Sequence, residues 1–263
     1  MNDGGPGILQ VAHTPAIGRP QLRAVMLSTA CIALAALSAC DGPTRPIEVE
    51  SQALQAEPSA AAVPQVKGGL PKVAFLGDSI AAGLHLAAEQ AFPAVAQRRL
   101  AASGVAFQLV NAGMSGDNTS GGLGRVDWLL KQAPSVVVVE LGANAGMRGV
   151  PVATIESNLR AIIAKIQAAG PKVLLLGVRL PPSFGAEYVS DFDAVYPRIA
   201  KDLEIPFVPF FMRGVAGRSE LNLPDGIHPT PEGHERIATT LAGPLKALLT
   251  DQALEEDPST LPR

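Results

Sequence analysis

The sequence predicts an α/β domain of three layers, in which helices cover both faces of a central parallel sheet of about five strands. Two observations carry this prediction. From Lys72 onward, short apolar runs rich in β-branched residues alternate with longer amphipathic segments, as in repeated strand–helix units. Residues Val136 to Val139 are four consecutive valines, a run typical of a strand buried on both faces.

The individual elements follow from these patterns. The expected strands are Lys72–Leu76, Phe107–Val110, Ser135–Leu141, Lys172–Val178 and Pro206–Val208. The expected helices lie around Phe92–Ala102, Gly124–Lys131, Val152–Ala169, Asp191–Leu203 and Pro231–Leu249. Ligands bind beyond the carboxyl ends of the strands in such sheets. Since Ser79, Gly116 and Asn144 each follow such an end, we expect the functional site there.

Two short motifs supply the side chains of serine-based acyl transfer. The first strand ends at Gly77-Asp78-Ser79, and Pro224-Asp225-Gly226-Ile227-His228-Pro229 follows much later in the chain. Ser79 offers a hydroxyl, His228 an imidazole to take its proton, and Asp225 a carboxylate to orient the imidazole. Taken alone, each motif also has a structural reading: Gly-Asp-Ser as a turn with a helix N-cap, Asp-Gly as a turn, and the histidine as a cap of the last helix.

Four blocks in order resemble the SGNH (GDSL) hydrolases. The blocks are Gly77-Asp78-Ser79-Ile80, Asn111-Ala112-Gly113-Met114-Ser115-Gly116-Asp117, Gly142-Ala143-Asn144 and Asp225-Gly226-Ile227-His228-Pro229. The resemblance spans residues 72 to about 248 and is closest to the bacterial thioesterase, arylesterase and lysophospholipase branch. It implies the flavodoxin-like fold of that family. The chain has no G-x-S-x-G motif, so the nucleophile elbow of the α/β-hydrolase fold is not expected.

The resemblance also implies a role for each site residue. Ser79 would be the nucleophile, His228 the general base and Asp225 its orienting carboxylate. The oxyanion hole would be formed by the backbone N–H groups of Ser79 and Gly116 and by the side-chain amide of Asn144. The implied reaction is hydrolysis of aryl esters, lysophospholipids or acyl thioesters through an acyl-enzyme on Ser79.

One position departs from the family pattern. Where this branch shows Gly-Gly-Asn-Asp, the chain has Gly142-Ala143-Asn144-Ala145, so the carboxylate beside the amide donor is lost. We expect Asn144 to be less firmly oriented as a result. This departure leaves a catalytically weakened lipoprotein that binds acyl ligands as an alternative. A carbohydrate O-acetyl esterase is the other alternative, because the same four blocks serve that chemistry elsewhere in the superfamily that the chain resembles.

Composition limits the other possibilities. The chain has 263 residues, 47% of them hydrophobic and 17% charged, and a formal net charge of −3, which suits one catalytic domain and gives no basic excess for nucleic acid. We expect a monomer with no cofactor and no metal, and read His85 and His234 as surface or packing residues. Arg148 and Arg179 are read as solvated side chains or as contacts for a charged substrate group.

The first part of the chain predicts export. Arg19 and Arg23 precede the apolar stretch Ala24–Ala36, and Leu37-Ser38-Ala39-Cys40 resembles the bacterial lipobox, which implies lipidation of Cys40. An ordinary cleaved signal is the alternative. We therefore divide the chain into a signal peptide (1–40), a disordered tether (41–71), the hydrolase domain (72–250) and a tail (251–263). The expected product is a periplasmic or cell-surface lipoprotein anchored to a membrane.

Overall fold

The chain is described over residues 69–251 in a computed structural model. The expected signal peptide, nearly all of the tether, Cys40 and residues 252–263 lie outside this part. Among the residues described, no helix is long and apolar enough to cross a bilayer.

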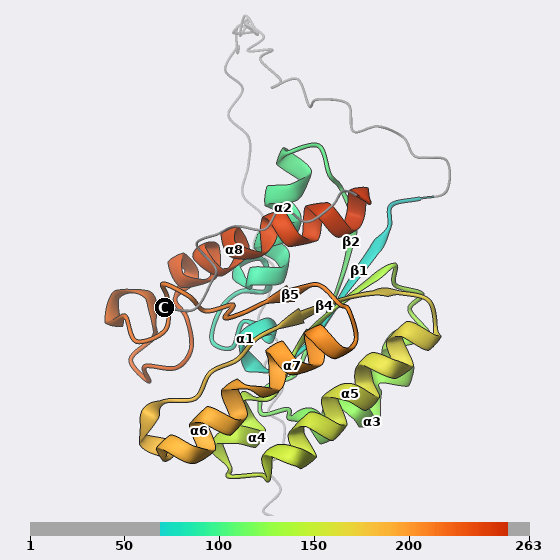
Figure 1. Cartoon of the computed structure of the whole chain (residues 1–263). Coiled ribbons are helices and arrows are strands. Elements are labelled where there is room, and N and C mark those ends of the chain that lie inside the picture. The colour runs from blue at the N-terminus through green and yellow to red at the C-terminus, as the bar shows by residue number, and fades with distance from the viewer. Residues whose placement is uncertain (1–68, 252–263) are drawn as a thin grey trace, which may run out of the picture. The chain divides into compact units, whose positions relative to one another are not determined.

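Five strands form one parallel sheet in the order β2-β1-β3-β4-β5 (Figure 1). Their bounds are β1 Lys72–Gly77, β2 Gln108–Gly113, β3 Val136–Glu140, β4 Lys172–Leu176 and β5 Phe207–Val208. The predicted fold class is confirmed, and each strand overlaps a predicted run with somewhat shifted ends.

The helices are α1 Ser79–Ala82, α2 Phe92–Ala102, α3 Thr119–Leu130, α4 Ala143–Met147, α5 Val152–Ala168, α6 Ala186–Asp193, α7 Val195–Asp202 and α8 Pro231–Thr250. Three short 3-10 helices lie in the connections of the described part of the chain: η1 Ala88–Gln90, η2 Pro182–Phe184 and η3 Ser219–Leu221. Helix α2 packs against α8 and α3 against α5, and Figure 1 shows these pairs on opposite faces of the sheet. The chain moves outward from β1 to β2 and then back past β1 to β3. Because such crossovers are right-handed, the helices after β1 and β2 fall on opposite faces.

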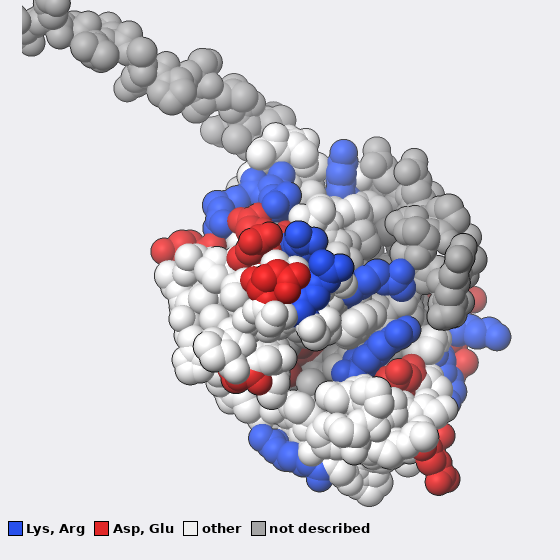
Figure 2. All heavy atoms as spheres, turned by 90° about the vertical axis from the view of Figure 1, so that its left-hand side faces the viewer, with Lys and Arg blue, Asp and Glu red and all other residues white. Residues whose placement is uncertain are grey.

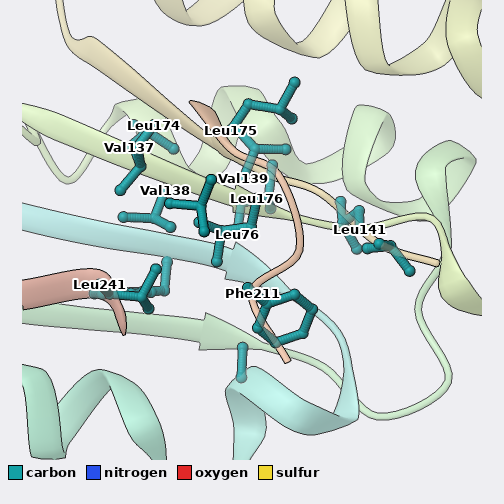
Figure 3. Packing of buried hydrophobic residues seen from close by; sticks show 14 of the residues in the cluster. Leu76, Val137, Val138, Val139, Leu141, Leu174, Leu175, Leu176, Phe211 and Leu241 are labelled. Carbon is teal, nitrogen blue, oxygen red and sulfur yellow. The ribbon is translucent and has the colours of Figure 1, made fainter. Parts of the chain in front are cut away.

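The core lies between these layers and is centred on β1, β3 and β4 (Figure 3). Leu76 pairs with Val139, which pairs in turn with Leu175, so three neighbouring strands place apolar side chains in one row. All three residues are fully buried. Full burial of such a side chain contributes about 1.5–3 kcal/mol. The valine run of β3 is therefore a central strand, as its sequence predicted.

Charged side chains of both signs lie side by side in groups on the surface, as Figure 2 shows for one face. Some of them join the paired helices: Arg99 of α2 bonds Glu235 of α8 at 2.6 Å, and Lys165 of α5 bonds Asp127 of α3 at 2.7 Å. Exposed ion pairs contribute only about 0–1 kcal/mol each. Apolar packing therefore holds the layers together.

The helix predicted over Asp191–Leu203 is in fact two helices, and this prediction was wrong. Helix α6 ends at Asp193 and α7 begins at Val195. Pro197 explains the break, because it has no N–H to donate to the carbonyl of Asp193 and its ring would clash there. Pro197 is tolerated in the first turn of a new helix instead.

The strand order reverses between β1 and β3, which creates a crevice beyond their carboxyl ends. Ser79 begins α1 directly after β1, and Asn144 lies in α4 directly after β3. The two residues therefore stand on either side of this switch point, where open α/β sheets bind ligands.

Candidate active site

A tight strand-to-helix turn fixes Ser79. Asp78 caps α1, since its Oδ1 accepts the N–H of Ile80 at 3.0 Å. Gly77 allows β1 to approach its neighbours closely: a Cβ there would lie 2.5 Å from the Cβ of Ala81 and 2.6 Å from an oxygen of Glu140. Ser79 is the first residue of the helix and is 9% exposed, so its position is set by backbone packing.

Two hydrogen bonds join Ser79, His228 and Asp225. The Oγ of Ser79 lies 2.9 Å from Nε2 of His228, and Nδ1 of His228 lies 2.8 Å from Oδ2 of Asp225. A carboxylate only accepts hydrogen bonds, so Nδ1 carries the imidazole proton and Nε2 is left to accept from the serine hydroxyl. This arrangement can remove a proton from Ser79.

Asp225 is held as a carboxylate by its own loop. Its Oδ1 accepts the backbone N–H groups of Ile227 and His228 at 2.8 and 2.9 Å. The N–H of His228, then that of Ile227 and then the His228 imidazole lower the pKa of Asp225 to about 2. The group is therefore ionised throughout the neutral range.

The loop itself is anchored to the start of α8. Asn222 and Pro229 form an antiparallel bridge, and the N–H of Leu223 donates to the carbonyl of His228 at 2.7 Å. Thr230 then caps α8 by accepting the N–H of Gly233. His228 thus stands at the junction of a closed loop and the last helix of the domain.

Asn144 is oriented by a carboxylate that the sequence did not suggest. Its Nδ2 donates to Oδ2 of Asp78 at 3.2 Å. The sequence predicted that Asn144 is less firmly oriented for want of a carboxylate at position 145, but Asp78 supplies a carboxylate contact to its amide. Ala145 is 1% exposed and belongs to the apolar core, while Asp78 orients the amide from the neighbouring strand end.

The loop that carries Gly116 is fastened on two sides. Gly116 has φ 78°, a left-handed conformation that glycine adopts without strain. Its carbonyl accepts from Nη2 of Arg148 at 3.2 Å, and the N–H of Met114 donates to the carbonyl of Gly77 at 3.0 Å. Arg148, read from the sequence as either solvated or ligand-binding, is exposed and contacts this loop.

Two buried carboxyl groups lie under the site. Asp78 is 1% exposed and Glu140 is fully buried. One oxygen of Glu140 accepts the N–H of Asp78 at 3.1 Å, and the other has no partner among the residues described. Burial, and then the charge of Asp78, raise the pKa of Glu140 well above its ordinary range. Burial also raises the pKa of Asp78 to about 6, against the opposing N–H of Ile80. Glu140 is the drier group, so it is the one that holds a proton.

The two remaining histidines of the domain have different surroundings. His234 is 1% exposed, and its Nδ1 accepts the N–H of Phe92 at 3.1 Å, which caps α2. Burial, and then the proximity of His228, lower the pKa of His234 to about 4, so it is a neutral packing residue. His85 is exposed, and its ring meets the ring of His228 edge-on with centroids 6.1 Å apart.

Sequence reasoning missed the contributions of Asp78, Glu140 and His85 to this site. Glu140 had a signal, because a charged residue that ends a run of four valines must be buried with the strand. Within residues 69–251, no group of three or more histidine, cysteine or acidic side chains could hold a metal ion.

A hydrogen-bonded Ser–His–Asp set at the switch point of a parallel sheet is the arrangement of a serine hydrolase. The chain belongs to the GDSL-like lipase/acylhydrolase family, whose model matches residues 75–236.

Curated relatives in this family share much of their sequence with the chain. It is 42% identical to the esterase TesA of Pseudomonas aeruginosa over 175 residues, which cover 66% of this chain and 87% of the relative. It is 37% identical to an arylesterase of Vibrio mimicus over 172 residues, covering 65% of this chain and 86% of the relative. It is 39% identical to thioesterase 1/protease 1/lysophospholipase L1 of Escherichia coli K12 over 176 residues, covering 66% and 83%.

Solved structures agree with these relatives. The crystal structure of TesA matches with a TM-score of 0.65 and 41% identity, covering 67% of this chain and 99% of TesA. The esterase EstA from Pseudoalteromonas, inhibited by monoethylphosphonate, matches with a TM-score of 0.65 and 33% identity, covering 68% and 98%. The family and these relatives identify the chain as a hydrolase of ester or thioester bonds.

Proposed function

We propose that Ser79 is the nucleophile of this hydrolase and His228 its general base. Ser79 Oγ attacks the acyl carbonyl while its proton passes to His228 Nε2, which returns it to the departing alcohol or thiol. A water molecule, deprotonated by His228, then cleaves the acyl-serine ester and releases the acid. The observation that carries this proposal is the continuous hydrogen-bonded chain from Ser79 through His228 to Asp225, at 2.9 and 2.8 Å.

The oxyanion of each tetrahedral intermediate would be bound by the N–H groups of Ser79 and Gly116 and by the Asn144 amide. The Asn144 amide suits this role, because among residues 69–251 it donates only to Asp78. The second N–H of the amide is then free for substrate. This ordered donor argues against a catalytically weakened lipoprotein.

The substrates that we propose are acyl esters and thioesters, including aryl esters and lysophospholipids. The names of the relatives support this range, since they are an esterase, an arylesterase and a thioesterase/lysophospholipase. A carbohydrate O-acetyl esterase remains the second candidate from the sequence, but none of these relatives carries such a name.

Labelling and turnover together test this proposal. An aryl-alkyl fluorophosphonate probe should label the wild-type protein and leave Ser79→Ala unlabelled, because the probe phosphonylates only an activated serine. Ser79→Ala should also lose roughly 10⁴–10⁶ in kcat on p-nitrophenyl butyrate. Turnover by Ser79→Ala within tenfold of wild type would contradict the nucleophile. A panel of p-nitrophenyl esters, acyl-CoA, lysophospholipid and acetylated xylan would rank the substrate classes.

We further propose that the domain is monomeric and that a lipidated Cys40 holds it at a membrane. The domain would then lie outside the membrane that the chain crosses during export. The support is the lipobox-like Leu37-Ser38-Ala39-Cys40 after a basic and apolar leader. A terminus that carries several acyl chains binds a bilayer stably, whereas a single chain does not. In detergent phase partitioning, full-length protein expressed in bacteria should therefore be found in the detergent phase. The Cys40→Ser variant should be found in the aqueous phase instead. A wild-type protein that is wholly soluble and begins at another residue would contradict the anchor.

A further inference from the structure

One partly buried arginine of α3, Arg125, binds three separate segments around the site. Arg125 Nε donates to Oδ2 of Asp117 at 2.7 Å, Nη1 donates to the carbonyl of Ala112 at 2.6 Å, and Nη2 donates to the carbonyl of Gly77 at 3.0 Å. Its side chain is 15% exposed and that of Asp117 is 5% exposed. The contacts are therefore largely shielded from water.

Each of these partners is next to a proposed oxyanion donor or to the strand that leads to it. Gly77 precedes Asp78 and Ser79 at the end of β1, while Asp117 directly follows Gly116. Ala112 lies near the end of β2, from which the Gly116 loop departs. One guanidinium thus spans the end of β1, the end of β2 and the loop between β2 and α3.

The loop has little other freedom once these bonds are made. The carbonyl of Gly77 accepts from Met114 N–H as well as from Arg125, and the N–H of Asp117 donates to the carbonyl of Met114 at 3.0 Å. Oδ1 of Asp117 accepts the N–H of Asn118 at 2.9 Å. Residues 114–118 are therefore held by hydrogen bonds within the loop and by a hydrogen bond to the end of β1.

The helix is shaped to admit the carboxylate of Asp117. A Cβ at Gly121 would lie 1.9 Å from Oδ1 of Asp117, so any larger residue at this position would displace it. Gly121 stands four residues before Arg125, on the same side of α3. Asp117, Gly121 and Arg125 thus form one unit with a four-residue spacing.

We propose that Arg125, paired with Asp117, is a positioning residue that sets the distance between the Gly116 and Ser79 backbone donors of the oxyanion hole. A lysine could keep the charge but could not reach three acceptors in a plane, as the guanidinium fork does. Small displacements of transition-state donors are costly, since a misplacement of about 1 Å can lower turnover roughly 10²-fold. This inference rests on the proposed role of Ser79.

Arg125→Lys tests the assignment, with Arg160→Lys as the matched control. Arg160 makes an ion pair with Glu156 within α5 and another with Asp202 of α7, and its side chain is 30% exposed. Both substitutions keep the charge and weaken a helix contact. Turnover of p-nitrophenyl butyrate is measured well below the melting temperature of each variant, together with hydrogen exchange of the peptide that spans residues 113–118.

Arg125→Lys should lower kcat by roughly 10–100-fold with KM within threefold, and should speed exchange in 113–118. Arg160→Lys should leave both unchanged. If Arg125→Lys does not fold, Asp117→Asn should also lower kcat and speed hydrogen exchange in residues 113–118. Both effects should be smaller than those expected for Arg125→Lys, because asparagine keeps one acceptor oxygen. If a folded Arg125→Lys or Asp117→Asn variant turns over substrate like wild type, Arg125 is not a positioning residue, while the proposed function of Ser79 is unaffected. Lack of Ser79-dependent turnover in the wild type would instead overturn the proposed function, and this assignment with it.

Discussion

The side-chain amide of Asn144 donates to the carboxylate of Asp78 across the ends of two neighbouring strands, with 3.2 Å between Nδ2 and Oδ2. Asp78 directly precedes Ser79 and caps the helix that Ser79 begins. One carboxylate therefore fixes both the turn of the nucleophile and the orientation of an oxyanion donor. The amide of Asn144 thus has a carboxylate partner, although position 145 of its own loop is an alanine.

This contact predicts a non-additive pair of substitutions. Asn144→Ala should lower kcat on p-nitrophenyl acetate by roughly 10² or more, the scale of a lost oxyanion donor. Asp78→Asn should lower it less, because its Oδ1 still caps α1 while an amide faces Asn144. The double variant should resemble Asn144→Ala alone, since no donor is left to orient. Fully additive losses would show that Asp78 does not act through Asn144.

Restoring the family residue at position 145 should not help. Ala145 is 1% exposed in the core, so Ala145→Asp would bury a carboxylate without a prepared partner. We expect a lower melting temperature and a kcat no higher than that of wild type. Thermal unfolding and p-nitrophenyl acetate turnover measure both. A stable variant with a several-fold higher kcat would mean that Asp78 leaves Asn144 poorly oriented.

Asp225→Asn should separate charge from loop geometry. An asparagine oxygen can still accept the N–H groups of Ile227 and His228, so the loop should keep its shape. Its amide would favour the wrong imidazole tautomer, which lowers kcat by about 10⁴ in serine hydrolases with this arrangement. Because the pKa of Asp225 is about 2, its protonation should not limit wild-type activity near neutral pH. A variant within tenfold of wild-type kcat would refute the orienting role.

His234 predicts a loss of stability in acid. Its pKa is about 4 in the folded protein and about 6.5 in the unfolded chain, so the unfolded state binds more protons between these values. Unfolding free energy should therefore fall by about 3 kcal/mol as pH drops from 7 to 4 on account of this residue. His234→Gln should remove that part of the slope. Urea unfolding at several pH values measures it, and parallel curves for the two proteins would contradict the prediction.

Glu140 predicts the opposite slope. Its pKa is raised in the folded state, so the folded protein binds the extra proton and loses stability as pH rises above the ordinary glutamate pKa. Glu140→Gln imitates the protonated side chain and can still accept the N–H of Asp78. The variant should gain stability relative to wild type as pH rises from 5 to 9, measured by urea unfolding. A difference that stays constant over this range would mean that Glu140 does not titrate there.

The sheet could be predicted because each strand carries its own signal. The valine run of β3 and the alternating strand and helix patterns depend on local sequence, and burial on both faces follows from them. The break between α6 and α7 was missed, although Pro197 is visible in the sequence, because the apolar pattern continues through it. Turns such as α4 are too short to show a period.

Ser79, Asp225 and His228 could be selected from the sequence because short motifs carry them. The partners that position them could not, since Asp78 meets Asn144 and Glu140 only when β1 lies beside β3. The order of the strands in the sheet cannot be predicted from the sequence of any single segment. Arg125 was hidden for the same reason: its three acceptors come from three parts of the chain.

Ser79 begins the first helix of the domain, directly after its first strand, and His228 precedes its last helix, 149 positions away. The proposed nucleophile therefore meets its base only when the beginning and the end of the domain have come together. A partly folded chain can hold helices and a collapsed core and still be chemically inert. During refolding, hydrolysis should thus return after helical circular dichroism, and phosphonate labelling would count only molecules that have closed the whole topology.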